Sequence, residues 1–308
     1  MVCAQSYPQS YPSRPVRIVV GYVAGGSVDL VGRALAQKLS LSLGQSVVVE
    51  NRAGASATLA AGTVAKSPAD GYTLLLGDTA PLVIAPFTNK GLAYDTLRDF
   101  TPISLIYAAT GMALVANANV QIKTFQDLVR EAKNNPGKLS YGSSGIASIH
   151  HLAMEVLKAD VGMDIVHIPY KGSGQSIIAV VSGEIPLLYS ALSTVIPHIA
   201  SGKVHLLAVG SPTRQPNYPN APTLSEMVKD FDVTGEFGVL GPAGLPAEVV
   251  GRLSGAIRQA AESADLIDKF KDSGGVIISN TPEQYAEHIR RNFRKFERAV
   301  RLAKIEPN

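Results

Sequence analysis

The stretch VRIVVGYVAGGSVDLVGRALAQKLSLSLG, residues 16–44, predicts the class of the fold. It begins with a β-branched run from Val16 to Val20, which is typical of a buried strand. A loop of small residues from Gly21 to Gly26 follows. A helix is then expected from Asp29 to Leu43, because its apolar residues recur on one face and Gly44 ends it. A strand, a glycine-rich loop and a helix in this order indicate an α/β protein.

The same order recurs along the chain and predicts its organisation. Strands are expected at residues 47–50, 72–76, 113–116, 138–141, 165–168, 187–189, 204–209 and 276–278, and from residue 237 onward. Helices are expected at about 58–65, 124–134, 148–158 and 265–271, from about residue 246, and after a capping box at Thr281. The proline-rich segment 211–222 is expected to run extended over the surface. We place domain crossings near residues 105 and 235, so that 1–105 and 235–308 form a discontinuous α/β domain and 106–234 a second α/β domain.

Composition excludes several classes of protein. The chain has 308 residues, 46% of them hydrophobic and 17% charged, which is enough for about two domains with cores of their own. The 28 Lys and Arg exceed the 25 Asp and Glu by only three, too few to neutralise many phosphates, so no nucleic-acid partner is expected. The uncharged stretches 101–121 and 185–202 contain too many polar residues to cross a bilayer. They predict buried parallel strands with loops beside them.

The N-terminal residues give an expectation about the compartment. Val2 to Gln5 are similar to the end of a secretory signal, with small residues before a cleavage point, so we expect maturation after Ala4 and a periplasmic protein. The alternative is that these N-terminal residues are an arbitrary end of the sequence and carry no targeting signal. Cys3 is the only cysteine, and its loss on processing would leave a cysteine-free protein, which fits the periplasm as well as the cytosol.

Three loops of small residues, at 24–27, 142–145 and 171–174, each follow an expected strand and precede an expected helix. Glycines let backbone N–H groups approach a ligand, the helix N-terminus adds partial positive charge, and serine hydroxyls supply donors. Ligands of open α/β sheets bind at such loops. Any one loop could be only a turn and a helix cap, but three of them shared between two domains favour an anion site.

Nucleotide-binding and catalytic motifs do not fit the chain. Gly26 is followed by Ser27 rather than by the Lys that a phosphate loop requires, and Ile177 stands at the third glycine of a dinucleotide fingerprint. A nucleophile elbow, a catalytic cysteine and the zinc motifs are absent from the sequence. We therefore expect no enzyme, no cofactor and no metal.

Two weaker functional interpretations involve the helix expected at about 148–158. His151 and Glu155 share a helix face, but two candidate metal ligands without a third indicate a hydrogen-bonded core more than a metal site. A hydrolase that uses Ser144 and His151 stays open, although no orienting acid can be named for it.

Eight strings of residues carry a resemblance to a known family. They are YPSRPVR at 11–17, AGGSVD at 24–29, VENRAGA at 49–55, DGYTL at 70–74, YGSSG at 141–145, HL at 151–152, HIPYKG at 167–172 and GVLGPAG at 238–244. In their joint order and spacing they resemble the Bug family, the periplasmic solute receptors of tripartite tricarboxylate transporters.

The resemblance implies a type II periplasmic binding protein fold, in which two α/β domains joined by crossing strands close over a ligand cleft. It implies a receptor that binds a small carboxylate and delivers it to the membrane permease subunits, or alternatively to a sensor protein. We expect a monomer. The candidate ligand-binding residues are Tyr22, Ala24, Gly25, Gly26, Ser27, Asp29, Asp78, Thr79, Ser143, Ser144, Gly145, Ser148, His151, Tyr170, Lys171, Gly172, Ser173 and Ser190.

Some residues depart from the family pattern. Gly21 stands where the family commonly has Pro, and Ser56 and Ala57 replace usual glycines. Ser190 lies where an Asp is frequent, so we expect a ligand without an α-amine, which favours a dicarboxylate or an aromatic acid. An α/β enzyme acting on a small carboxylate and a ligand-sensing domain that feeds a signalling partner remain alternatives.

Overall fold

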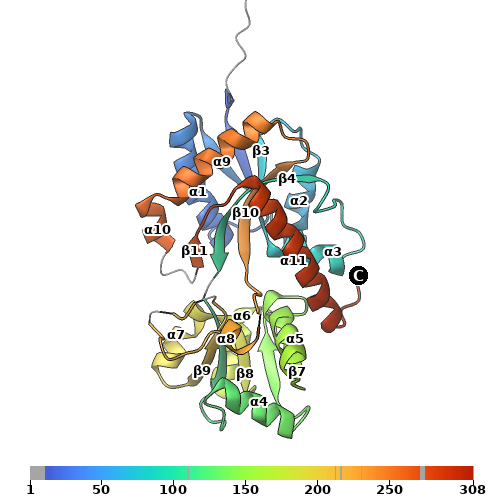
Figure 1. The fold of residues 1–308 in the computed structure, drawn as a ribbon, viewed down its shortest axis with the longest axis vertical. Coiled ribbons are helices and arrows are strands. Elements are labelled where there is room, and N and C mark those ends of the chain that lie inside the picture. The colour runs from blue at the N-terminus through green and yellow to red at the C-terminus, as the bar shows by residue number, and fades with distance from the viewer. Residues whose placement is uncertain are drawn as a thin grey trace, which may run out of the picture.

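The computed structural model describes residues 11–109, 111–211, 213–215, 217–229, 231–270 and 275–307. The expected signal segment, Val2 to Gln5, lies outside these residues. The ribbon forms two lobes that follow one another along the longest axis (Figure 1). Each lobe is built on its own β-sheet.

The first lobe contains a six-stranded sheet in the order β11-β4-β10-β3-β1-β2. Its strands are β1 (Val16–Val20), β2 (Val47–Asn51), β3 (Thr73–Asp78), β4 (Phe100–Ala109), β10 (Glu236–Pro242) and β11 (Gly275–Ile277). Its helices are α1 (Ser27–Leu43), α2 (Thr58–Ala65), α9 (Ala247–Ala261), α10 (Ala264–Phe270) and α11 (Pro282–Leu302), with the short turns η1 (Ala55–Ala57), η2 (Ala80–Ile84) and α3 (Ala85–Thr88).

The second lobe contains a five-stranded sheet in the order β7-β6-β8-β5-β9. Its strands are β5 (Met112–Asn117), β6 (Ser140–Ser143), β7 (Val166–Pro169), β8 (Leu187–Ala191) and β9 (Val204–Val209). Its helices are α4 (Phe125–Asn134), α5 (Ile149–Val161), α6 (Ser173–Ser182), α7 (Leu192–Ala200) and α8 (Leu224–Met227).

Parallel pairing brings the loops after several strands to one edge of each sheet. β1 pairs in parallel with β2 and β3, so that Val20 lies beside Asn51 and Leu76. In the second sheet β6 pairs in parallel with β7 and β8. The carboxyl ends of parallel strands meet at the same edge, and the strand-to-helix loops of each lobe therefore lie together.

The chain crosses between the lobes twice. It leaves the first sheet after Ala109 and enters the second at Met112, and it returns between β9 and β10. The two crossings are joined, because the N–H of Ala109 donates to the carbonyl of Gly235 at 2.7 Å. A division into domains at these crossings is our proposal.

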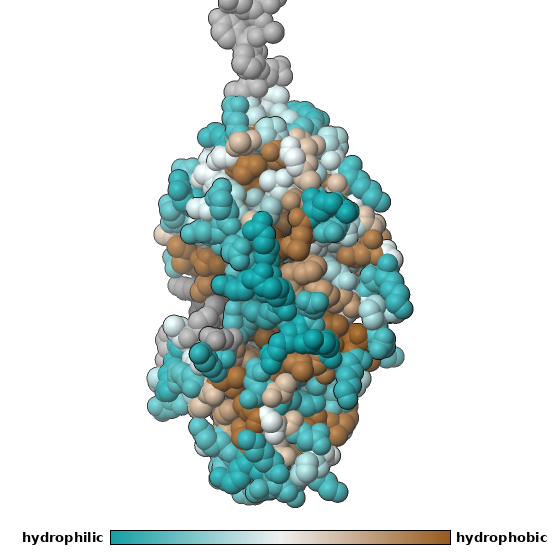
Figure 2. Space-filling view, turned by 45° about the vertical axis from the view of Figure 1, so that its right-hand side comes forward, coloured by the Kyte–Doolittle hydropathy of each residue, from teal (hydrophilic) through white to brown (hydrophobic). Residues whose placement is uncertain are grey.

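The last helix, α11, belongs to the first lobe but packs on both. As expected, Thr281 caps it in a capping box with Gln284. Its apolar face, which includes Ile289 and Phe296, enters a buried cluster that also holds residues of both sheets. The helix descends from the first lobe onto α5 of the second (Figure 1). In the space-filling view a hydrophilic band runs between the lobes on the side that carries α11 (Figure 2).

The expectation of buried parallel strands is wrong for 101–121, and in 185–202 it holds only for the pairing of β8 with β6. β4 pairs antiparallel with β10 and β11, and β5 pairs antiparallel with β8 and β9. Half of the second stretch is the helix α7, which contains Pro197. A strand does lie in the first stretch, since β4 spans Phe100–Ala109, and the sheet accommodates Pro102 at an irregularity in its register.

Other predictions agree with the structure. The strands at 16–20 and 204–209 and the helix at 58–65 have the bounds expected for them. The mixed α/β fold with two sheets is confirmed. Among the described residues, none of the helices combines the length and apolar content that a bilayer crossing requires.

Candidate functional site

A cavity of about 360 Å³ lies between the lobes at the loop-bearing edges of both sheets. Four of the candidate residues line it: Asp78 at the end of β3, Thr79 after it, and Ser144 and Ser148 between β6 and α5. Its remaining walls are Ser56, Ala80, Ile84, Ala85, Thr88, Ile146, Ala147, Ile149 and Gly235. A molecule in this cavity would contact both lobes and a crossing segment at once.

The loop after β1 is tied to the cavity through Tyr22. The Tyr22 hydroxyl donates to Oδ2 of Asp78 at 2.7 Å, and the carbonyl of Tyr22 accepts from Nδ2 of Asn51 at 3.0 Å. The α1 helix begins after Gly26 without a side-chain cap from the described residues, so its first N–H groups remain available to a ligand or to water. Residues 24–27 thus lie at the correct edge, although they do not line the cavity.

Asp29 is buried beneath this loop and holds its shape. Its Oδ2 accepts from the N–H of Gly25 and from Nε of Arg33, each at 2.9 Å, and its Oδ1 accepts from Nδ2 of Asn51 at 2.8 Å. Burial alone would raise the pKa of Asp29, but these hydrogen bonds, with the charge of Arg33, lower it below the usual value. The carboxylate is satisfied within the protein, and its role in the site is to position the loop.

In the loop between β6 and α5, neighbouring serines point in different directions. Ser143 is buried, and its Oγ lies 2.7 Å from Nε2 of His167. Ser144 lines the cavity, with its Oγ 2.7 Å from Nδ1 of His150. Ser148 caps α5 by accepting from the N–H of His151 at 3.3 Å. Ser144 and Ser148 are therefore the hydroxyls that the second lobe offers to a ligand.

His151 lies in the core of the second lobe. Its ring stacks on His167 with centroids 3.7 Å apart, and its Nδ1 accepts from the N–H of Ala147 at 3.2 Å. Burial lowers the pKa of His151, and it lowers the pKa of His167 to about 4, so both rings are neutral near pH 7. Glu155 is held by Tyr141 and Lys158, each at 2.7 Å. Within the described residues, no three His, Cys, Asp or Glu side chains are grouped to hold a metal.

The remaining candidates of the second lobe do not line the cavity. The N–H of Tyr170 donates to the carbonyl of Ser143 at 3.1 Å, which places the 170–173 loop beside the serine loop. Gly172 has a φ of 102°, a conformation that favours glycine, and α6 begins after it without a side-chain cap from the described residues. Ser190 is only 1% exposed, and its Oγ lies 3.5 Å from Oγ1 of Thr194.

The cavity also includes residues that the sequence analysis did not select, and Ser56 is the clearest of them. Ala55, Ser56 and Ala57 have consecutive positive φ angles of 47°, 52° and 68°. Non-glycine residues rarely adopt such angles, and strained backbone is often found at ligand sites. The replacement of the family's usual glycines at 56 and 57 was a signal of this turn. Gly21 is needed beside it, since a Cβ there would collide with Ala57.

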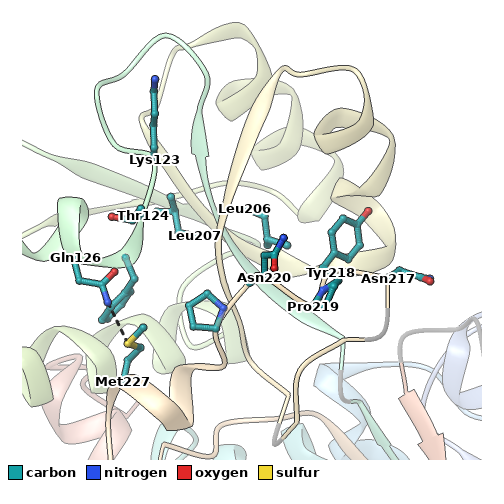
Figure 3. Close-up of a pocket in the computed structure, with 13 residues that line it drawn as sticks. Lys123, Thr124, Gln126, Leu206, Leu207, Asn217, Tyr218, Pro219, Asn220 and Met227 are labelled. Atoms are coloured by element: carbon teal, nitrogen blue, oxygen red, sulfur yellow. Dashed lines mark hydrogen bonds between the residues drawn. The ribbon is translucent and has the colours of Figure 1, made fainter.

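Three larger cavities are less suited to an anionic ligand, and one of them, of about 630 Å³, is lined by the first lobe alone. Another, of about 550 Å³, lies wholly in the second lobe, and its lining includes Lys123, Gln126, Tyr218 and Met227 (Figure 3). A ligand there would touch one lobe only. Another, of about 670 Å³, lies beside α11, where Lys295 pairs with Asp232 at 2.9 Å and His288 with Glu236 at 2.6 Å. Its acidic and basic groups largely balance, so it offers little net attraction to an acid.

Comparisons with known proteins agree on one family. The tripartite tricarboxylate transporter family receptor matches residues 31–304. Protein BugT of Bordetella pertussis is 32% identical over 302 residues, which cover 97% of this chain and 92% of BugT. A protein of R. palustris solved with adipate is 30% identical with a TM-score of 0.78, covering 97% of this chain and 100% of its own. MatC from Rhodopseudomonas palustris with bound malate is 26% identical with a TM-score of 0.72, covering 94% and 100%.

Proposed function

The chain belongs to the tripartite tricarboxylate transporter receptor family, and from this premise we propose that it is an extracytoplasmic receptor that binds a small dicarboxylate in the cavity between its lobes. The observation that carries the proposal is that one cavity of about 360 Å³ is lined by hydroxyls from both lobes. The relatives solved with adipate and with malate support a carboxylate as the ligand.

Neutral donors hold the acid in this proposal. The described residues that line the cavity include Ser56, Thr79, Ser144 and Ser148 but no Lys or Arg. Hydroxyls and backbone N–H groups stabilise a carboxylate through charge-assisted hydrogen bonds, and they avoid the cost of burying a cation that has no partner when the site is empty. Selectivity then arises from the spacing of donors across the two lobes.

The favoured ligand has no α-amine. A serine stands at position 190, where the family frequently has an aspartate, and that serine is buried. Adipate and malate, the acids bound to the two relatives, also lack an amine. An amine-free dicarboxylate is therefore preferred to an acidic amino acid, and an aromatic acid is the second choice.

Binding is proposed to act through closure of the lobes. The open and closed forms interconvert about the crossings near Ala109 and Gly235, and a ligand that contacts both lobes stabilises the closed form. The closed complex is delivered to the permease subunits in the membrane, and a sensor protein is the alternative recipient.

A thermal-shift screen followed by calorimetry tests the ligand class. The panel contains adipate, malate, benzoate, glutamate and aspartate. We expect an amine-free dicarboxylate to give the largest rise in melting temperature. A ligand at 100 times its Kd adds about 2.7 kcal/mol of stability, which makes the rise measurable. Tighter binding of glutamate or aspartate than of every amine-free acid would overturn the ligand assignment. Mass spectrometry of the acid recovered after long incubation should find it unchanged, whereas a product would indicate an enzyme.

A further inference from the structure

Asp78 ends β3 at the wall of the ligand cavity and has only one of its two oxygens engaged. Oδ2 accepts the hydrogen bond from Tyr22 at 2.7 Å. Oδ1 is buried and has no hydrogen-bond partner among the described residues. The same residue also lines a second, smaller cavity of about 20 Å³ on the side toward α11.

The small cavity is also lined by Asn292, which carries a second unpartnered oxygen. The Nδ2 of Asn292 donates to Oε2 of Glu236 at 2.7 Å, which fixes the amide, since the reversed orientation would place oxygen against a carboxylate. Its Oδ1 is buried and has no partner within the described part of the chain. A cavity of about 20 Å³ is large enough for one water. Two unpartnered acceptor residues thus line a space for one water, together with the hydroxyl-bearing Thr79 and Tyr285.

The groups that face Asp78 do not compensate a negative charge. Tyr22 comes from the β1 loop, Tyr94 from the segment after α3, Glu236 from β10, and Tyr285 and His288 from α11. His288 is already engaged by Glu236 at 2.6 Å and by Arg291 at 2.8 Å. Neither cavity is lined by a Lys or Arg among the described residues. Burial raises the pKa of Asp78 to about 6, although Tyr22 and nearby backbone N–H groups act in the opposite direction.

We propose that Asp78 takes up one proton from solvent when a dicarboxylate binds, and that the neutral carboxyl is held through a water in the small cavity to Asn292. The inference rests on the proposed function, because the ligand supplies the additional negative charge that disfavours an ionised Asp78. The added hydrogen on Oδ1 donates to the water, and the water donates to Oδ1 of Asn292. No bond of the ligand is broken.

Proton uptake is measured by titrating adipate and malate into the protein at pH 7.5 in phosphate and in Tris, two buffers with different heats of ionisation. We expect roughly 0.5–1 proton to be taken up per ligand. Between pH 7.5 and 6.5 we expect Kd to tighten several-fold, up to about eightfold, because the free carboxyl titrates near pH 6.

Three variants test whether Asp78 is the group that takes up the proton. Asp78→Asn keeps the shape and can donate without titrating, so proton uptake and the pH dependence of Kd should disappear, and adipate should bind more tightly than to the parent chain at pH 7.5 because the amide needs no added proton. Glu131→Gln, at a partly exposed position of α4 remote from both cavities, is the matched control and should behave as the parent chain. His150→Asn tests a second titratable group near the cavity, whose Nδ1 lies 2.7 Å from the Ser144 hydroxyl. This variant should keep the uptake.

The outcomes separate this inference from the function on which it rests. Uptake that is lost in Asp78→Asn and kept in the other two variants supports it. Binding without proton uptake overturns the coupling and leaves the receptor function standing. Uptake that persists in Asp78→Asn and disappears in His150→Asn overturns it as well. If neither acid binds, the dicarboxylate proposal fails and the inference fails with it.

Discussion

Ser143 and Ser144 are adjacent serines with different surroundings, and they provide a matched test of the site. Ser144→Ala removes a hydroxyl that lines the cavity, so we expect adipate to bind about 3–10-fold more weakly. Ser143→Ala removes the partner of His167 in the core, so we expect the free energy of unfolding to fall by about 1–3 kcal/mol with little change in affinity. Calorimetry and chemical denaturation measure the two effects. An equal loss of affinity in both variants would contradict the assignment of the hydroxyls.

The direction of single side chains is what the sequence could least predict. The small-residue loops were correctly expected between strands and helices, because glycine and serine after an apolar run have a local cause. Which residue of a loop faces the ligand depends on partners far away in the sequence. Asp29 faces Asn51, Ser143 faces His167, and the ring of His151 stacks on the same His167. No local sequence pattern predicts contacts between residues so far apart in the chain.

The turn η1 is an element under strain that can be relieved. Ser56 is exposed and has a φ of 52° and ψ of 44°, in the left-handed region. Ser56→Gly removes the steric cost of that conformation, so we expect a gain of about 1 kcal/mol in unfolding free energy. The same change in a regular helix, Ser254→Gly in α9, should lower stability by about 0.5 kcal/mol. Denaturant titration of both variants gives the comparison. A loss of stability in Ser56→Gly would show that the serine side chain makes a contact that stabilises the fold by more than the backbone strain destabilises it.

The spacing of apolar residues predicted the helices and strands that bury one regular face. It failed for elements whose structure depends on partners distant in the sequence. The amphipathic α11 was expected from its spacing and its capping box. The helix α7 was not, because its residues from Leu192 to Ala200 carry no charged face and include a proline. The antiparallel pairing of β4 with β10 and β11 was not predicted either, since the uncharged stretch 101–121 was expected to form parallel strands. Neither partner is close to β4 along the chain.

The whole molecule is held together on the side of α11. The chain's last helix packs on η2 in the first lobe and on α5 in the second, and Arg298 forms an ion pair with Asp160 of α5. Phe293 also packs on Phe87 with ring centroids 4.6 Å apart. Opening the lobes on this side would break these contacts. We therefore expect the lobes to move about a pivot beside α11 and to open at the loop-bearing edges.

Small-angle scattering during a titration with adipate tests this motion. We expect the radius of gyration to fall, with its midpoint at the calorimetric Kd, because the ligand stabilises the form in which both lobes contact it. In Ser144→Ala the same final compaction should be reached at about 3–10-fold higher adipate, since the variant weakens the contacts of one lobe without blocking the pivot. An unchanged radius at saturation would mean that the acid binds a preformed site. In that case closure of the lobes would not be the signal for the delivery to a permease that we propose.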